Sequence, residues 1–305
     1  TEKEADVARD DYLEMIQGLT ETVRPMPQNN LIDRDQDGPI PRVNVSVKLS
    51  ALFSQFDPID PEGTTNQVLK RLIPILESAR KTGAFVNFDM EQYTRKDLTL
   101  SIFEKVLTLP AFRDWPDAGI AMQAYLRDTA SDLKRLRDWA QKRGTSVVVR
   151  LVKGAYWDFE TIQASQNHWP IPVWSKKRES DAEYERLSQF LLDNRQYLKP
   201  AFASHNIRSL SHAMAYARLR NIPDNAYEIQ MLYGMADPIK EALVGLGQRV
   251  RVYTPYGELI PGMAYLVRRL LENTANDSFL RASFSDHVSE DTLLADPCQE
   301  SPVLA

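Results

Sequence analysis

Short apolar runs alternate with amphipathic helical patterns along most of this 305-residue chain. Most runs are rich in β-branched or aromatic residues, as expected of strands buried on both faces. The eight runs are Val43–Leu49, Ala84–Met90, Gly119–Ala124, Ser146–Lys153, Ile171–Ser175, Ala201–Ser204, Tyr227–Leu232 and Arg249–Thr254. Helical spacing between them occurs at Asn66–Thr82, Asp128–Gly144, Asp181–Asn194, Ile207–Arg220 and Asp237–Gly245. This alternation, over about 250 residues, predicts an α/β fold of the (β/α)8 TIM-barrel type.

A doubly wound sheet is the alternative fold, and it usually has a glycine-rich phosphate-binding first turn. Neither G-x-G-x-x-G nor G-x-x-x-x-G-K-[ST] occurs here, which favours the barrel. We therefore expect three regions. Residues 1–42 form an N-terminal helical arm, with helical spacing over Glu4–Leu19, followed by a loop rich in Pro and Asp. Residues 43–285 form the barrel, and residues 286–305 are a tail or linker without a clear pattern.

Composition excludes several classes of protein. The net charge of −5 argues against a general nucleic-acid binder. No run of about 18 apolar residues is present, so no membrane-spanning helix is expected. The single cysteine, Cys298, allows neither an internal disulfide nor a cysteine metal site, which favours the cytoplasm. The chain starts at Thr1 in a charged helical pattern, and we interpret it as a piece of a longer polypeptide.

Polar side chains gather at the predicted carboxyl ends of the strands, where barrels place their active sites. Strand ends usually meet water, and this accounts for roughly half of these residues. It accounts less well for Lys48, Asp89, Gln123 and Arg150, which lie inside apolar runs. A charge in a buried strand is costly unless it is paired or functional. The excess of cationic and amide groups suits an anionic, polar ligand.

Two adjacent arginines lie in a predicted helix, 261–273, after the last strand. Arg268 and Arg269 share its polar face with Tyr265 and Glu272. A guanidinium binds a carboxylate with two parallel hydrogen bonds. Such a pair is more often a solvated helix face. A helix after the last barrel strand can nevertheless cover the mouth, which favours a carboxylate clamp.

No metal site is expected. The segment Asp33–Gly38 resembles the start of a calcium loop, but Asn44 stands where a bidentate glutamate is needed. His205 and His212 lack a third ligand in phase.

Five stretches together resemble the proline dehydrogenase family, most of all the proline dehydrogenase domain of bacterial bifunctional proline utilization proteins. They are Ser46–Leu52, Arg150–Asp158, Ala203–Asn206, Tyr227–Leu232 and Tyr265–Asn273. The R-L-V-K-G-A-Y-W and Y-L-V-R-R-L-x-E-N strings are the most specific.

The resemblance implies a distorted barrel with non-covalent FAD at its mouth and the last helix above it. It implies oxidation of L-proline to Δ1-pyrroline-5-carboxylate, with hydride passing to flavin N5 and electrons then passing to a membrane quinone. It also implies a bacterial cytoplasmic protein, with peripheral association at the inner membrane as an open option. We expect fusion to a pyrroline-5-carboxylate (glutamate semialdehyde) dehydrogenase domain.

Residue roles follow by motif position. Lys48, Arg268 and Arg269 would bind the proline carboxylate, and Tyr253 and Tyr265 would pack around the ring. Asp89 and Arg150 would be the catalytic pair, with Arg150 beside flavin N5. The expected FAD contacts are Met90, Gln123, Arg150, Val152, Lys153, Gly154, Trp157, Ser204, His205, Asn206, Gln230 and Glu272. A related flavin barrel for hydroxyproline or a reduced folate, and a binding or regulatory module without catalysis, are the alternatives.

Overall fold

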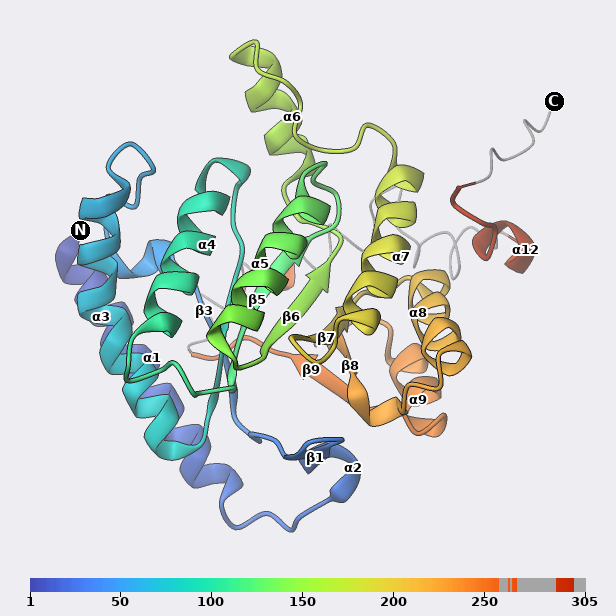
Figure 1. Cartoon of the computed structure of the whole chain (residues 1–305), viewed down its shortest axis with the longest axis horizontal. Helices are drawn as coiled ribbons and strands as arrows, with labels where there is room; N and C mark the ends of the chain where they lie inside the picture. Colours follow the sequence, from blue (N-terminus) through green and yellow to red (C-terminus); the bar gives the residue numbers. More distant parts are fainter. Residues whose placement is uncertain (258–262, 264, 268–288, 299–305) are drawn as a thin grey trace.

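A single sheet of seven parallel strands organises the molecule. The computed structural model describes residues 1–257, 263, 265–267 and 289–298. In this part the strands pair in chain order: β3 (Asn44–Val47), β4 (Phe85–Phe88), β5 (Ala118–Gln123), β6 (Val147–Val152), β7 (Leu198–Ala203), β8 (Glu228–Leu232) and β9 (Val250–Tyr253). The sheet curls into a half-barrel, and helices run along its outer side (Figure 1). This architecture is consistent with a distorted TIM barrel.

The predicted strand Ile171–Ser175 is wrong. Val173 forms only an isolated antiparallel bridge with Leu126, outside the sheet. Pro172 disfavours a strand at this position, because proline has no N–H to donate to a ladder. The other seven predicted strands are confirmed. The connection from β6 to β7 therefore contains two helices, α6 (Trp157–Gln166) and α7 (Lys177–Asp193), and no strand of the sheet.

The helices begin and end at residues suited to those positions. In α3 (Pro61–Thr82), Asp60 caps the first turn, and Gly83 ends the helix with φ +72°. Gly144 ends α5 (Thr129–Arg143) in the same way, with φ +77°. Glycine adopts this left-handed conformation without a steric penalty. The remaining helices that follow strands are α4 (Tyr93–Thr108), α8 (Ile207–Leu219) and α9 (Asp237–Gly245), and short 3₁₀ turns occur at η1 (Leu49–Leu52) and η2 (Asp224–Ala226).

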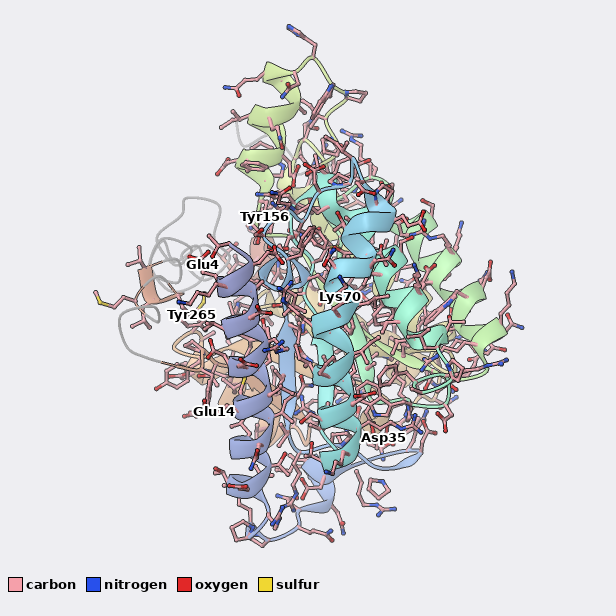
Figure 2. The ribbon with its side chains drawn as sticks, turned by 90° about the vertical axis from the view of Figure 1, so that its left-hand side faces the viewer. Glu4, Glu14, Asp35, Lys70, Tyr156 and Tyr265 are labelled. Carbon is pink, nitrogen blue, oxygen red and sulfur yellow. The ribbon has the colours of Figure 1, made fainter. Side chains whose placement is uncertain are left out.

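The N-terminal helix α1 (Glu2–Val23) lies side by side with α3 (Figure 2). Arg71 of α3 is 2.8 Å from Glu2 and 2.7 Å from Asp6 of α1. The predicted helical arm is thus confirmed, with wider bounds. Because Arg71 is largely buried, these ion pairs fix the arm to the barrel more firmly than exposed pairs would.

The Pro- and Asp-rich loop contains α2 (Asn30–Asp33) and a small hairpin, β1 (Arg34–Asp35) with β2 (Gly38–Pro39). Its carboxylates pair with cations: Asp33 with Arg42, and Asp35 with Lys199. No cluster of potential metal ligands is found among the described residues. Within the same part of the chain, no helix is long and apolar enough to cross a membrane. A short helix, α12 (Glu290–Leu293), lies in the described part of the predicted tail.

Candidate active site

Arg150 is the centre of the candidate site at the carboxyl ends of the strands. Its Nε donates to Oε1 of Gln230 at 2.7 Å, and its Nη1 donates to Oδ1 of Asp89 at 2.7 Å. Its Nη2 donates to the Ser46 hydroxyl at 3.0 Å. Arg150 is only 7% exposed, so the ion pair lies in a medium of low dielectric. Four segments, β3, the end of β4, β6 and β8, thereby converge on one guanidinium.

Tyr253, at the end of β9, completes this cluster. The Arg150 guanidinium carbon lies 5.3 Å from the centre of the Tyr253 ring. The Tyr253 hydroxyl donates to Oδ2 of Asp89 at 3.5 Å. Burial, and secondly the Asp89 carboxylate, raise the pKa of Tyr253. The phenol therefore stays neutral at physiological pH and presents a ring and a donor.

Lys48 follows β3 and adds a second cation to this end of the sheet. Its backbone N–H donates to the Tyr12 hydroxyl at 3.2 Å, which ties α1 to the site. Its ammonium has no ion pair or hydrogen bond among the described residues. With Arg150 matched by Asp89, the Lys48 charge remains available for an anion. The predicted grouping of Lys48, Asp89, Arg150 and Tyr253 at one end of the sheet is observed.

The segment after β6 has a backbone that only glycine tolerates. Gly154 has φ +143°, and a Cβ there would lie 2.4 Å from the Tyr125 ring. Next to it, Lys153 pairs with Asp181 and lies 5.7 Å from the centre of the Tyr184 ring. Burial lowers the pKa of Lys153, and Asp181 opposes this effect. The segment is therefore held close to the barrel by aromatic packing and one ion pair.

Gln123, at the end of β5, has a buried oxygen without a partner. Its Nε2 donates to the Glu91 carbonyl at 3.2 Å, while its Oε1 accepts no hydrogen bond in the described structure. A buried unsatisfied amide oxygen is unfavourable unless a ligand or water satisfies it. Val152 is the register partner of Gln123, and the largely buried Met90 follows β4.

Ser204, His205 and Asn206 link the end of β7 to the start of α8. The Asn206 side chain accepts from the Ser209 N–H at 3.2 Å and caps α8. The Ser204 hydroxyl accepts from the Asn206 N–H at 3.1 Å. His205 Nε2 accepts from the Leu232 N–H at 3.1 Å, across to the end of β8. Helix capping alone explains part of this motif.

Two predicted aromatic residues lie at the edges of the site. Trp157 is 41% exposed, and its Nε1 donates to the Trp174 carbonyl at 2.8 Å. Tyr265 is largely buried, and its hydroxyl donates to the Tyr233 carbonyl at 3.0 Å. Arg268, Arg269 and Glu272 lie outside the described residues, so the clamp stays a prediction.

The sequence analysis did not identify Glu228, the residue that orients Gln230. Glu228 accepts from Gln230 Nε2 at 2.6 Å and pairs with Arg251 at 2.9 Å. Burial alone would raise the pKa of Glu228, but Arg251 and Arg249 lower it to about 2. Glu228 therefore stays ionised and orients Gln230 toward Arg150. A glutamate inside an apolar strand pattern was the available signal.

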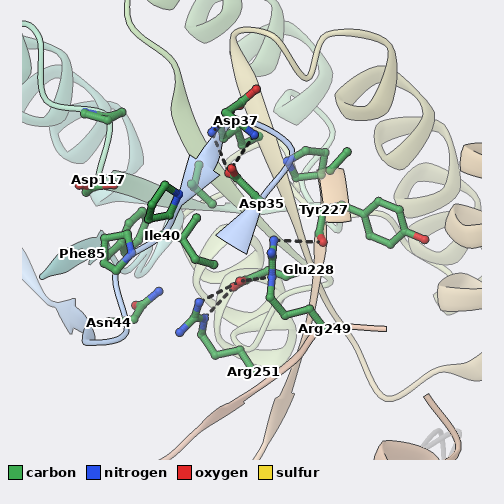
Figure 3. Close-up of a pocket in the computed structure, with 17 residues that line it drawn as sticks. Asp35, Asp37, Ile40, Asn44, Phe85, Asp117, Tyr227, Glu228, Arg249 and Arg251 are labelled. Carbon is green, nitrogen blue, oxygen red and sulfur yellow. Dashed lines mark hydrogen bonds and ion pairs between the residues drawn. The ribbon is translucent and has the colours of Figure 1, made fainter. Parts of the chain in front are cut away.

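A cavity of about 200 Å³ opens at the opposite, amino-terminal end of the strands (Figure 3). The hairpin residues Asp35 and Asp37 face Lys199 there, at 2.9 and 2.7 Å. Arg249 donates to the Arg34 carbonyl at 2.8 Å and closes the hairpin onto β9. In barrels this end serves stability, so the Arg150 end stays the predicted site of the chemistry.

Comparisons with known proteins identify the family of the chain. The proline dehydrogenase family model matches residues 1–282. The chain belongs to the proline dehydrogenase family. A crystal structure of proline utilization A (PutA) from Bdellovibrio bacteriovorus inactivated by N-propargylglycine is 50% identical with a TM-score of 0.96, and the match covers 98% of this chain and 31% of that one.

Curated relatives of two kinds are similar to the chain. The bifunctional protein PutA of Klebsiella aerogenes is 33% identical over 86% of this chain. Proline dehydrogenase 1 of Bacillus subtilis subsp. natto is 30% identical over 70% of this chain and 62% of its own length. The chain spans 20% of the length of the Klebsiella protein.

Proposed function

We propose that this protein oxidises L-proline to Δ1-pyrroline-5-carboxylate with bound FAD. The observation that supports this most is the Arg150 cluster at the carboxyl ends of the strands. There, a buried ion pair, an aromatic ring and an unmatched lysine meet in a member of the proline dehydrogenase family. A small zwitterion with an apolar ring needs these groups: a cation for its carboxylate and an aromatic wall for its ring.

One feature of the structure fits a flavin. The buried Oε1 of Gln123 lacks a donor, and a flavin ring system presents an N–H that could supply one. Gly154 packs directly on the Tyr125 ring, where a Cβ would be 2.4 Å away, and this contact holds the backbone beside the expected cofactor. Gln123, Lys153, Gly154, Trp157 and His205 would hold the cofactor. When bound, FAD supplies the hydride acceptor.

The protein groups would orient the substrate and stabilise charge. Lys48, with the predicted Arg268 and Arg269, would bind the proline carboxylate. Tyr253 would form one wall of the ring pocket and keep water out. Arg150, fixed by Asp89, would hold a positive charge where negative charge develops in the transition state. Arg150 is preorganised, because each of its three guanidinium nitrogens already has a partner.

The two kinds of relatives suggest an electron acceptor and a longer natural polypeptide. We propose that electrons leave to a membrane quinone, with peripheral association at the membrane. We also propose that the natural polypeptide includes a pyrroline-5-carboxylate dehydrogenase region, because the bifunctional relatives are about five times as long as the matched segment.

Turnover tests the proposal directly. L-proline should bleach the flavin absorbance of the FAD-loaded protein, and the protein should then reduce a quinone or an artificial dye. It should turn over trans-4-hydroxy-L-proline more slowly. Absence of flavin bleaching by L-proline would refute the proposal. Preference for hydroxyproline would assign a different substrate to the same site.

A further inference from the structure

Glu160 is a buried carboxylate on a helix that exposes large apolar side chains. In α6 the buried residues are Glu160 and Ala164, and Glu160 is 2% exposed. Phe159 and Ile162 on the same helix are 42% and 56% exposed. Amphipathic helices normally show the opposite arrangement. Since a buried carboxylate is costly without a compensating partner, the inward position of Glu160 calls for a specific contact.

That contact is the first turn of another helix. Glu160 Oε1 accepts from the Tyr93 backbone N–H at 2.7 Å, and Tyr93 is the first residue of α4. The residue at the cap position, Gln92, makes no side-chain hydrogen bond to this turn. Glu160 therefore caps α4 from a distant segment, and the partial positive charge of the helix start stabilises its carboxylate. Burial raises the pKa of Glu160, and the Tyr93 hydrogen bond opposes this effect.

The hydrogen bond joins two loops that belong to different parts of the candidate site. The loop before Tyr93 contains Asp89, the partner of Arg150. The segment before α6 contains Gly154, which rests on the Tyr125 ring. The loop with Asp89 would lie next to the expected substrate, and the loop with Gly154 would lie next to the expected cofactor.

Each loop also has contacts of its own: Lys153 pairs with Asp181 on the Gly154 side, and Glu91 accepts two hydrogen bonds on the Asp89 side. Ser50 donates to the Glu91 carboxylate at 2.9 Å, and Gln123 donates to the Glu91 carbonyl at 3.2 Å. Both partners come from the β3 and β5 side. In the described structure, Glu160 is the residue of α6 that hydrogen-bonds to the start of α4.

We propose that Glu160 is a positioning residue that sets the distance between the Asp89 loop and the segment 153–157. On the proposed function, this distance places the proline ring relative to the flavin. Glu160 would act through its carboxylate oxygen, which accepts the hydrogen bond from the Tyr93 N–H, and not through contact with the substrate. Small errors in such a distance lower the rate of the chemical step more than they weaken substrate binding.

The kinetic test compares three variants of the flavin-loaded protein. Glu160→Ala should slow flavin reduction by proline about 10- to 100-fold with a smaller change in KM. Glu160→Gln keeps an acceptor oxygen and should recover the rate to within about threefold, because the hydrogen bond remains. Ile162→Ala, an exposed change on the same helix, should leave the rate unchanged. If Glu160→Ala does not fold, Glu160→Asp is the alternative. It shortens the side chain by one methylene and should also slow flavin reduction.

Hydrogen–deuterium exchange provides a readout that does not need catalysis. Glu160→Ala should speed exchange in the peptide that contains Tyr93 and in the segment 153–157, while Glu160→Gln should not. Unchanged exchange, or faster exchange with an unchanged rate of flavin reduction, would overturn the proposal. If the wild-type protein is not reduced by proline, the proposed function fails, and exchange at Tyr93 still decides whether Glu160 holds the loop.

Discussion

The two ends of the sheet each contain buried charges, but the charges described at each end are paired differently. At the amino-terminal end, Arg251 pairs with Glu228, and Lys199 pairs with Asp35 and Asp37. At the carboxyl end, Arg150 pairs with Asp89, and the Lys48 ammonium has no such partner among the described residues. Paired buried charges hold elements in place, whereas an unmatched cation is available to an anionic ligand. The difference supports the proposal that the carboxyl end is the binding end.

The largest expected effect is that of removing Arg150. Arg150→Met should lower kcat/KM for proline by about 10³-fold, because the positive charge at the reacting centre and the partner of Asp89 are both lost. Steady-state kinetics at matched flavin content would measure it. Arg150→Lys is the control: it keeps the charge without the three-way hydrogen bonding, so its activity should lie between the two. Kinetics of Arg150→Met close to wild type would contradict the assignment of this end.

Removing Glu228 should instead lower stability. Its folded pKa of about 2 lies well below the ordinary glutamate value of 4.5. This carboxylate stabilises the fold fully above pH ~4.5, by about 3 kcal/mol, and the contribution is lost as the pH falls toward 2. Glu228→Gln should therefore lower the unfolding free energy at neutral pH. Denaturant unfolding across pH would show the wild-type and variant values converging in acid, and a constant difference would be inconsistent with this view.

The sequence predicts the strands of the fold better than it predicts which side chains contact one another. Strand–helix alternation identifies seven strands and their order, because a strand buried on both faces needs an apolar run. The same rule fails at Ile171–Ser175, where Pro172 removes a donor that a ladder requires. Apolar composition alone cannot distinguish such a run from a strand.

Individual site residues are predictable, but their partners are not. Asp89 and Arg150 stand out as charges inside apolar runs, yet their pairing across 61 residues depends on strand register. Glu160 gives no sequence signal, because a glutamate in a helix is usually solvent-exposed. Its role becomes visible only when the start of α4 lies beside it.

The lysine at the binding end should affect substrate affinity. Lys48→Met should raise KM for proline about tenfold, which corresponds to about 1.4 kcal/mol, with kcat and flavin content nearly unchanged. The reason is that Lys48 would meet the substrate carboxylate and holds no described side chain in place. Steady-state kinetics with flavin absorbance checks it. Equal losses of flavin and proline binding would instead show a structural role.

Lys199→Met applies the same charge removal to the opposite end and should give the smallest effect. Its ion pairs are partly exposed, so we expect a loss of about 1 kcal/mol in unfolding free energy and unchanged KM. Burial would lower the pKa of Lys199, but its hydrogen bonds to Asp37 and Asp35 raise it. The contribution of Lys199 to the free energy of unfolding is therefore complete below about pH 10.4. It is lost as the pH rises through the pKa of Lys199 in the folded protein. Unfolding measured at neutral and alkaline pH tests this. A raised KM in Lys199→Met would mean that the two ends are coupled, and the distinction between them would then fail.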